Sequence, residues 1–329
     1  VPDSGCGSWL LEPQSTNFAV PSDNKNNINS GDIQGTYVPN VLITAPDNSN
    51  TAYKFTPTQL GQSVEGASAS TNNRLYFEYG GVNTTYTNSI YVKSVSGNTF
   101  NFAIKVVNQS SDTLISSKTI LVTDVWKRVD VTGLVNGSSS GIRYVIKSEQ
   151  AVNLWGFQIE QQSYSTSYIP TNGAASTRLR DIANNSGNAT LFNSTEGVLY
   201  AEIAALADDL TSRRFSISDG TNNNRVMIGY KTTSNALQFV LSDSGAVVVN
   251  STYTLSDIKE ITKIAFKYKV NDCKVYVNGA LAIQDTTATM PSGLNTIGFN
   301  QGSGNENFYG KVKALVVYKE ALTDEQLTC

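Results

Sequence analysis

Residues 154–181 read LWGFQIEQQSYSTSYIPTNGAASTRLRD and fall into two halves of different character. In the first half Trp155, Phe157 and Ile159 point one way and the residues between them the other, which is typical of a β-strand with one deeply buried face. The alternation then stops, and Pro170, followed by an Asn-Gly pair, predicts a turn or an extended crossing. This stretch therefore predicts the end of one β-domain and the exit toward another.

The composition of the 329 residues favours an all-β protein with two domains. Charged residues make up 16% of the chain and hydrophobic residues 40%, and Asn, Ser and Thr supply much of the polar surface. β-Branched and aromatic residues favour strands, whereas Asn, Gly and Asp favour turns. The length suits two domains of ordinary size, each able to bury its own core.

The charge and the residue counts argue against several classes of function. The formal net charge is −3 and no basic stripe stands out, so we expect no nucleic-acid partner. No run of about eighteen apolar residues occurs, so we expect no insertion into a membrane. The sequence contains no histidine, which removes the commonest general base and the usual zinc ligands. An enzyme built on this chain would depend on carboxylates.

The three cysteines give no structural framework. Cys6, Cys273 and Cys329 lie far apart in the sequence and form no CxxC pair. We interpret them as incidental thiols, and a bridge between Cys6 and Cys329 near the two ends stays open.

Short strands separated by turn residues recur in both halves of the chain. In the first half Thr51–Pro57 and the run around Ile142 alternate, which predicts an antiparallel sandwich or jelly roll. In the second half Lys274–Ile283 places an Asn-Gly pair between two alternating runs, the strongest short-range signal for a hairpin. Thr323 with Gln326 three residues later predicts a capped C-terminal helix.

These patterns predict an all-β chain with two antiparallel β-sandwich or jelly-roll domains joined by a short linker. Trp9, Leu10 and Leu11 are expected to anchor the N-terminal arm on a neighbouring surface. The predicted parts are an extended arm at 1–36, a sandwich at 37–181, a linker at 182–195 and a jelly roll at 196–329.

Three motifs in the first half resemble those of a known family. They are SWLLEPQSTN (Ser8–Asn17), VWKRVDVTG (Val125–Gly133) and WGFQIE followed by SYIPT within Leu154–Asp181. They resemble a carbohydrate-binding-like β-sandwich that is common in tailed-phage fibres and other virion proteins. The resemblance implies a place on the surface of a phage particle, outside the cell, contact with other virion proteins, and assembly as a homo-oligomer, most commonly a trimer.

The second half resembles a different family. EGVLYAEIAAL (Glu196–Leu206), SDGTNNNR (Ser218–Arg225) and FYGKVKALVVYKEALTDEQL (Phe308–Leu327) occur in the order typical of concanavalin-like, laminin-G-type jelly rolls. The resemblance implies a lectin-like fold. Sandwiches of both families often hold a structural calcium ion, for which this sequence indicates no particular site; we expect no other cofactor.

The carboxylates do not form the pattern that glycan hydrolysis needs. Hydrolases of the concanavalin-like fold usually carry an E-x-D-x-x-E strand, and glycosidases need two carboxylates roughly 5–10 Å apart. Glu196 and Glu202 are too far apart in sequence, and Asp257 with Glu260 lacks the leading Glu. We therefore predict no catalytic residues.

Two polar loops of the second half are the candidate binding site. Sugars stack their apolar faces on aromatic rings, and Asn side chains both donate to and accept from hydroxyls. Loops Ser218–Asn224 and Asn300–Tyr309 combine Asn, Gly and nearby tyrosines, although ordinary turn chemistry explains the same residues. The candidate residues are Asp219, Asn222, Asn224, Tyr230, Asn305, Asn307 and Tyr309, with Tyr86 as a stacking candidate in the first half.

The combined prediction is a phage virion protein, a tail fibre or receptor-binding protein, that binds host-surface glycans without cleaving them. Two alternatives stay open. The chain could be a purely structural decoration or connector of the particle, or a secreted bacterial glycan-binding protein.

Overall fold

The computed structural model describes residues 7–19, 35–39, 41–61, 63–64, 74–79 (backbone), 83–134 and 142–328. Strands account for nearly all of the regular structure, and the single helix in the described ranges has four residues. The all-β prediction is confirmed. No helix in the described ranges is long and apolar enough to cross a membrane.

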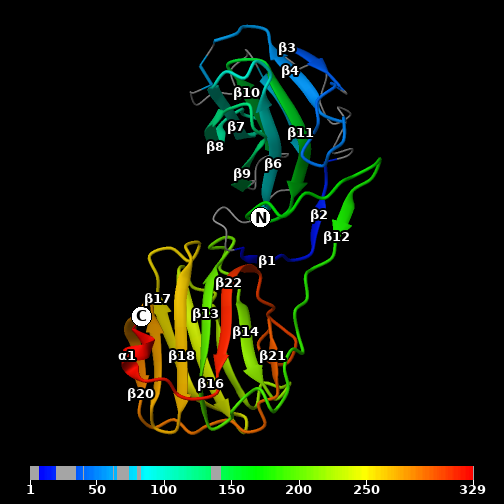
Figure 1. Cartoon of the computed structure of the whole chain (residues 1–329). Helices are drawn as coiled ribbons and strands as arrows, with labels where there is room; N and C mark the ends of the chain where they lie inside the picture. The colour runs from blue at the N-terminus through cyan, green and yellow to red at the C-terminus, as the bar shows by residue number, and fades with distance from the viewer. Residues whose placement is uncertain are drawn as a thin grey trace. The chain divides into compact units, whose positions relative to one another are not determined.

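The chain divides into two compact units, as expected, but not at the predicted boundaries. The sandwich unit is Gln14–Leu179, and the jelly-roll unit is Val1–Pro13 together with Arg180–Cys329 (Figure 1). The residues of the predicted arm are therefore divided between the two units. Its first strand pairs within the jelly-roll unit and its second strand pairs within the sandwich unit.

The predicted exposed linker at 182–195 is also corrected by the structure. Phe192 is 8% exposed and belongs to the core of the jelly-roll unit. Ser186 forms an antiparallel bridge with Ile297, so this stretch lies along the jelly roll. The Asn- and Ser-rich composition resembles a linker, but one aromatic ring supplies enough apolar surface to fix the segment.

The sandwich unit consists of two antiparallel sheets with a core between them (upper part of Figure 1). One sheet has the order β3-β4-β11-β6-β9 and the other β5-β10-β7-β8, and β2 pairs with β12. The strands are β2 (Ser15–Asn17), β3 (Gly35–Val38), β4 (Tyr53–Pro57), β5 (Arg74–Tyr79), β6 (Thr85–Ser94), β7 (Phe100–Asn108), β8 (Leu114–Val122), β9 (Lys127–Leu134), β10 (Ile142–Ser148), β11 (Val152–Glu160) and β12 (Ser176–Arg178).

Strand β11 is buried along its whole length, and it does not alternate as the sequence predicted. The register with β6 shifts between Trp155 and Gln158, where Gly156 adopts a φ of +67°. A bulge of this kind adds one residue and reverses the faces beyond it. As a result Phe157 lies in the main core, whereas Trp155 joins a separate cluster with Tyr168, at a ring distance of 4.4 Å.

Polar side chains fasten the outer face of β11 to the segments that cover it. Asn17 donates to the carbonyl oxygens of Phe157 and Ile169, at 3.2 and 2.8 Å, and accepts from the backbone N–H of Ile159. Gln158 accepts from the N–H of Ile169 at 2.7 Å and donates to Glu160. Residues of the Ser8–Asn17 and WGFQIE…SYIPT motifs thus hold the architecture of this unit.

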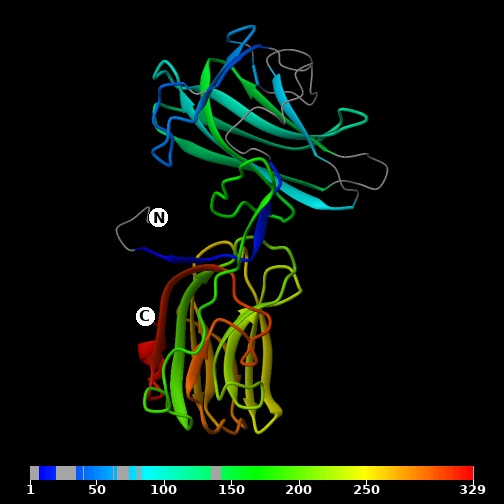
Figure 2. The same cartoon turned by 90° about the vertical axis from the view of Figure 1, so that its right-hand side faces the viewer.

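The jelly-roll unit consists of a six-stranded and a five-stranded antiparallel sheet that face each other. Figure 2 shows the two layers side by side in the lower part of the view. The first sheet has the order β1-β22-β13-β18-β19-β20 and the second β17-β16-β15-β14-β21. The strands are β1 (Trp9–Leu11), β13 (Glu196–Ala204), β14 (Arg213–Ser218), β15 (Arg225–Tyr230), β16 (Ala236–Asp243), β17 (Ala246–Thr254), β18 (Thr262–Lys269), β19 (Cys273–Val277), β20 (Ala280–Asp285), β21 (Thr296–Gly298) and β22 (Gly310–Tyr318).

Aromatic rings join the two sheets of the jelly roll. Phe239 of β16 meets Phe266 of β18 edge to face, with ring centroids 5.9 Å apart. Phe308, before β22, lies edge to face against Phe215 of β14 at 5.6 Å. All four rings have no more than 1% exposed surface. Such contacts contribute about 0.5–1.5 kcal/mol each beyond the burial of apolar area.

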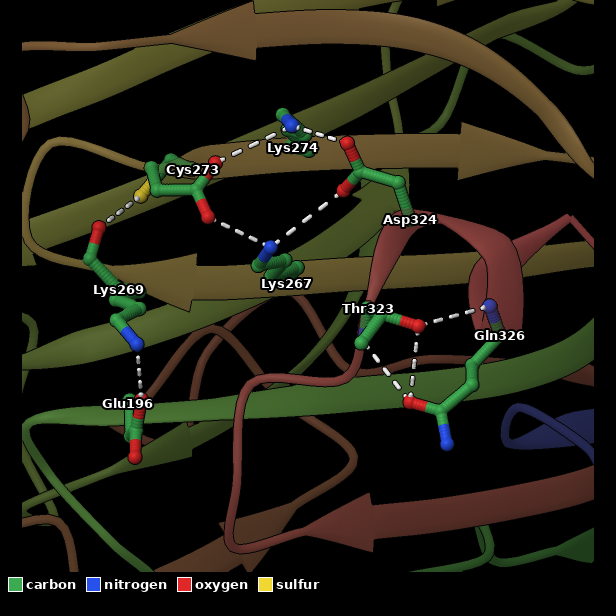
Figure 3. A network of polar contacts seen from close by, with 9 residues as sticks. Glu196, Lys267, Lys269, Cys273, Lys274, Thr323, Asp324 and Gln326 are labelled. Carbon is green, nitrogen blue, oxygen red and sulfur yellow. Dashed lines mark hydrogen bonds and ion pairs between the residues drawn. The ribbon is translucent and has the colours of Figure 1, made fainter.

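Two local predictions in this unit are confirmed. Asn278 and Gly279 join β19 to β20 with φ values of +51° and +78°, as a two-residue hairpin turn requires. Helix α1 (Asp324–Leu327) begins at Thr323, and the capping box with Gln326 is formed (Figure 3).

A group of four charged residues holds α1 against the outer face of the six-stranded sheet. Asp324 forms ion pairs with Lys274 at 2.5 Å and with Lys267 at 3.5 Å (Figure 3). Asp272 meets Lys267 at 2.6 Å, and that lysine side chain is only 7% exposed. The hydrogen bond from Lys274 lowers the pKa of Asp324. Burial opposes the charge on Asp272, but the two lysines outweigh it and lower its pKa as well.

We predict that Asp324→Asn lowers the melting temperature at pH 7 by roughly 1–3 °C, since exposed ion pairs contribute little. A lowered carboxyl pKa stabilises the fold above the unfolded value of about 3.9, and this contribution is lost as the pH falls through the folded value. The difference from wild type should therefore shrink below about pH 4. Calorimetry from pH 3 to 7 tests this, with the exposed Glu320→Gln as control; a difference that grows in acid contradicts it.

We predict that residues 14–179 fold alone and unfold cooperatively. Residues 190–329 alone should melt lower than the same unit in the full chain, because β1 is missing and the edge of β22 is left unpaired. Expression of both fragments followed by circular dichroism tests this. A 190–329 fragment that melts at the same temperature as this unit in the full chain would contradict the role of β1. An insoluble 14–179 fragment would contradict independent folding of the sandwich unit.

Candidate functional site

The two loops predicted to carry the site lie against each other in the jelly-roll unit. The first connects β14 to β15 and the second leads from β21 to β22. A Cβ added at Gly302 would lie 2.5 Å from the carbonyl oxygen of Thr221, and Gly302 has a φ of +117°. Only glycine suits this backbone conformation and this close approach.

Two arginines fasten the second loop to the sheet. Arg225, 9% exposed, donates from one nitrogen to Asn222 Oδ1 at 2.8 Å and to the carbonyl oxygen of Gln301 at 2.6 Å. Burial, together with the neighbouring Arg214, lowers the pKa of Arg225. Arg214 forms an ion pair with Glu306 at 2.5 Å. The loop is thus fixed before any ligand arrives.

A polar cavity of about 260 Å³, here called the polar cleft, opens where the loops meet. Asn300 organises its floor. Asn300 is 6% exposed, donates to Asn184 Oδ1 at 2.8 Å, and accepts from the N–H groups of Gly302 and Gly304. The lining residues are Asn184, Asn185, Ser218, Gly220, Thr296, Gly298, Asn300, Gly302, Ser303 and Gly304.

The lining of the polar cleft is neutral and rich in hydrogen-bonding groups. None of these ten residues carries a charge. Asn185 and Ser303 are exposed; within the described residues the Asn185 side chain has no hydrogen bond, and the Ser303 hydroxyl accepts one from Gln301 Nε2 at 3.4 Å. Thr296 Oγ1 is buried in the wall with no partner in this part of the structure. The cleft therefore presents amides and hydroxyls whose hydrogen-bonding capacity is not used up by the fold.

An apolar cavity of about 390 Å³, here called the apolar groove, lies on the opposite face of β21 from the polar cleft. It lies at the edge of the unit between β1 and β21. Asn184 lines both cavities. The residues of the groove are Trp9, Leu11, Ala183, Asn184, Ser186, Ile297, Phe299 and Leu315.

Three predicted site residues of the first loop serve its turn. Asp219 accepts from the backbone and hydroxyl of Thr221, and from Asn224 at 2.9 Å. Burial opposes its charge, but these hydrogen bonds outweigh it and lower the pKa of Asp219. Asn224 also accepts from the N–H groups of Ser244 and Ser292. Asn222 is engaged with Arg225, so none of the three lines the cleft.

Two predicted stacking residues are wrong because their rings are buried. Tyr230 is 1% exposed and lies against Phe308, with ring centroids 5.9 Å apart. Burial raises the pKa of its hydroxyl. Tyr86 is 5% exposed and belongs to the core of the sandwich unit. Both rings lie in the cores of their units, so they cannot present a face to a ligand.

The predicted residues of the second loop lie beside the polar cleft and not in it. Asn305 is exposed, and Asn307 forms a bridge with Arg214. Tyr309 is half-buried, and burial raises its pKa. None of the three lines either cavity. The residues of these two loops that line the polar cleft are Ser218, Gly220, Asn300, Gly302, Ser303 and Gly304.

Sequence reasoning missed Asn184 and Asn185, which lie in the predicted linker, and Trp9, which lies in the predicted arm. Trp9 does not anchor the arm, since it is 67% exposed; Leu11 supplies that contact. The positive φ of Asn185, +59°, has no distinctive sequence signal. The strand pairing that brings residue 9 beside residue 312 is a long-range contact that local patterns do not reveal.

Within the described ranges no three His, Cys, Asp or Glu side chains gather as a metal site would require. Structural calcium stays a prediction. Cys273 is buried as a free thiol, and burial raises its pKa to about 11. Cys6 and Cys329 lie outside the described residues.

A family model, the concanavalin A-like lectin/glucanases superfamily, matches residues 182–328. This is nearly the whole continuous part of the jelly-roll unit, which has a concanavalin A-like fold. The match includes Asn184 and Asn185 and excludes Trp9. No curated protein matches the sequence of the chain.

Several solved structures are similar to parts of the chain. A leech intramolecular trans-sialidase has 20% identity and a TM-score of 0.35, over 45% of this chain and 26% of that chain. The Ruminococcus gnavus IT-sialidase CBM40 has 16% identity and a TM-score of 0.33, over 45% of this chain and 93% of that chain. A CBM4 structure has 12% identity and a TM-score of 0.28, over 35% of this chain and 73% of that chain.

We predict that Asn224→Ala lowers the free energy of unfolding by about 1–3 kcal/mol, because it removes three hydrogen bonds and leaves partners unsatisfied. The neighbouring Asn223 is exposed, and Asn223→Ala is the matched control, with an expected change within about 0.5 kcal/mol. Chemical denaturation of the full chain measures both. Equal midpoints for the two variants would mean that Asn224 does not hold the turn.

Proposed function

We propose that the polar cleft of the jelly-roll unit binds a glycan and does not cleave it. The observation that carries this proposal is an uncharged cavity lined with amides and hydroxyls, in which the exposed Asn185 side chain has no hydrogen bond within the described residues and the exposed Ser303 hydroxyl keeps its donor. Sugar hydroxyls need partners that both donate and accept, and Asn and Ser provide both. The concanavalin A-like fold supports the same function, although a fold alone does not assign one.

The absence of cleavage is part of the proposal. Glycoside hydrolysis needs two carboxyl groups, one of them free to donate a proton. Glu202 on β13 is engaged by Lys313 at 2.9 Å, and the hydrogen bond from Lys313 lowers its pKa. Glu196 on the same strand pairs with Lys269 at 3.0 Å. No Asp or Glu lines the polar cleft.

We further propose that the chain works on a bacteriophage particle, as a tail-fibre or receptor-binding protein, and binds glycans of the host surface. Support comes from the motifs that resemble virion sandwiches, and the same resemblance supports assembly with other virion proteins and as a trimer. A glycan-binding protein secreted by a bacterium would use the same cleft. In a purely structural virion protein, the polar cleft would bind no glycan.

We predict that Asn185→Gly weakens glycan binding by about tenfold while the melting temperature stays within about 1 °C of wild type. The φ of +59° suits glycine, and the variant removes one amide that the fold does not use. Calorimetric titration of the full chain with neutral linear hexasaccharides (cello-, xylo-, manno-, malto- and chitohexaose) measures the affinity.

The matched control is Asn271→Gly. Asn271 is also exposed with a φ of +56°, and it does not line the cleft. Its affinity should equal that of wild type. No detectable binding of any hexasaccharide by the wild-type chain would overturn the proposed function.

A further inference from the structure

We propose that the glycan bound in the polar cleft carries a carboxylate group, and that the guanidinium of Arg225 binds this group at the rim of the cleft. The ligand class is then an acidic oligosaccharide, with a uronic acid or another carboxylated ring. This inference rests on the proposed function of the cleft and adds to it the class of sugar and the residue that selects it.

Arg225 lies beside the polar cleft, on the same face of the sheet. In the register of β14 and β15 it stands opposite Ser218, which lines the cleft. Side chains of such cross-strand partners project from one face, with Cβ atoms about 4.5–5.5 Å apart. Arg225 Nη1 also donates to the carbonyl oxygen of Gln301 at 2.6 Å, and this carbonyl belongs to the peptide bond that leads into Gly302 of the lining. The guanidinium is therefore within one peptide unit of the cleft.

One edge of this guanidinium has no partner. Both hydrogen bonds of the Arg225 side chain among the described residues come from Nη1, one to Asn222 and one to Gln301. Nε is buried without a partner, and Nη2 reaches the surface without a hydrogen bond in this part of the structure. Nε–H and Nη2–H form the side edge of the planar group, which matches the two oxygens of a carboxylate. The fold leaves this edge unbonded.

A row of polar groups without partners crosses the sheet at the level of Arg225. Thr296, Ser218, Arg225 and Ser242 stand opposite one another on β21, β14, β15 and β16. The hydroxyls of Thr296 and Ser242 are buried with no partner among the described residues, like Arg225 Nε. Buried polar atoms in proteins nearly always have a hydrogen-bond partner. Three such atoms in one row, which begins in the lining of the cleft, indicate that a bound molecule supplies the partner.

The charge of Arg225 is not balanced within the fold. Arg225 is 9% exposed and forms no ion pair among the described residues. Glu306 is the carboxylate that acts on it, and Glu306 is already paired with Arg214 at 2.5 Å. Burial, and then the charge of Arg214, lower the pKa of Arg225. A buried charge is costly unless a group of opposite sign lies close to it, and a carboxylate of the ligand supplies that group.

The hydrogen-bonding groups that remain available in the polar cleft are mostly donors. The Oδ1 atoms of Asn184 and Asn300 already accept hydrogen bonds within the fold. The hydroxyls of Ser218 and Ser303 each accept one, so both keep their hydrogen to donate. A carboxylate only accepts hydrogen bonds, whereas a sugar hydroxyl both donates and accepts. A ring that carries a carboxylate therefore uses these donors more fully than a neutral ring does.

The test is calorimetric titration of the full chain with acidic hexasaccharides and their uncharged methyl esters. The probes are hexagalacturonate, hexamannuronate and hexaglucuronate, each compared with its ester and with the five neutral hexasaccharides. We expect at least one acid to bind at least about tenfold tighter than its ester. This ratio should fall as the salt concentration is raised from about 0.1 to 1 M, because salt screens the charges.

Arg225→Gln removes the charge and the unbonded edge, and we expect it to bring the ratio of acid to ester affinity close to one. A loosened loop would weaken both ligands alike, so the ratio isolates the carboxylate. The matched control is Lys311→Gln, which removes a positive charge from an exposed residue that lines neither cavity and should keep the wild-type ratio. A second measurement uses the wild-type chain labelled with ¹⁵N at arginine. The acid should shift the Nε–H signal of Arg225, and the ester should not.

The outcomes separate the two proposals. Equal affinity of wild type for every acid and its ester overturns the acidic class, and it leaves the cleft in place when the neutral hexasaccharides bind and Asn185→Gly weakens them. A ratio that Arg225→Gln leaves unchanged, with the Arg225 Nε–H signal unmoved in wild type, overturns the role of Arg225 and with it this inference. Binding of neither acidic nor neutral hexasaccharides by wild type overturns both proposals.

Discussion

The buried carboxyl group of Glu160 organises the packing around β11 in the sandwich unit. Glu160 has no exposed surface, and the hydrogen bonds to it come from neutral groups, those of Ser15, Gln158, Gln162 and Thr166. Removing a carboxylate from water costs several kcal/mol unless its oxygens find donors. The donors come from β2, from β11 itself and from the segment that follows β11, so the carboxyl group has all of these hydrogen bonds only when β2 and that segment cover β11 together. The covering of β11 and the path of the chain that follows this strand therefore depend on Glu160.

In the jelly-roll unit, hydrogen bonds likewise distinguish residues that hold the loops together from residues that are available to a ligand. Asn224 and Asn300 resemble binding residues by type, but their capacity is used between loops. Asn185 resembles an ordinary loop residue, yet it lines the cleft and its side chain forms no hydrogen bond within the described residues, while the hydroxyl of Ser303 accepts only a long one from Gln301. A polar residue is a candidate for recognition when the fold leaves its hydrogen bonds free, and residue type alone does not reveal this.

Local chemistry made much of the fold predictable. The Asn278-Gly279 turn and the capping box at Thr323 depend on residues within four positions of each other, and both form as the sequence indicates. The bulge at Gly156 was not predicted, because a single inserted residue leaves the local composition unchanged while it reverses the faces of β11. The two loops were predicted as candidates, but neither their contact with each other nor the lining of the cleft was, since both depend on long-range pairing. The family motifs of the first half proved to mark buried polar contacts.

A two-dimensional NMR titration of the full chain, labelled with ¹⁵N at Asn, Gln and Trp, tests the central claim most directly. It reports every side-chain amide and indole N–H while a neutral hexasaccharide is added. The account predicts shifts at the Asn184 and Asn185 amides, with the Asn17 and Gln158 amides unchanged. Shifts confined to side chains of residues 14–179, with those of the polar cleft unmoved, would place recognition in the sandwich unit and contradict the account.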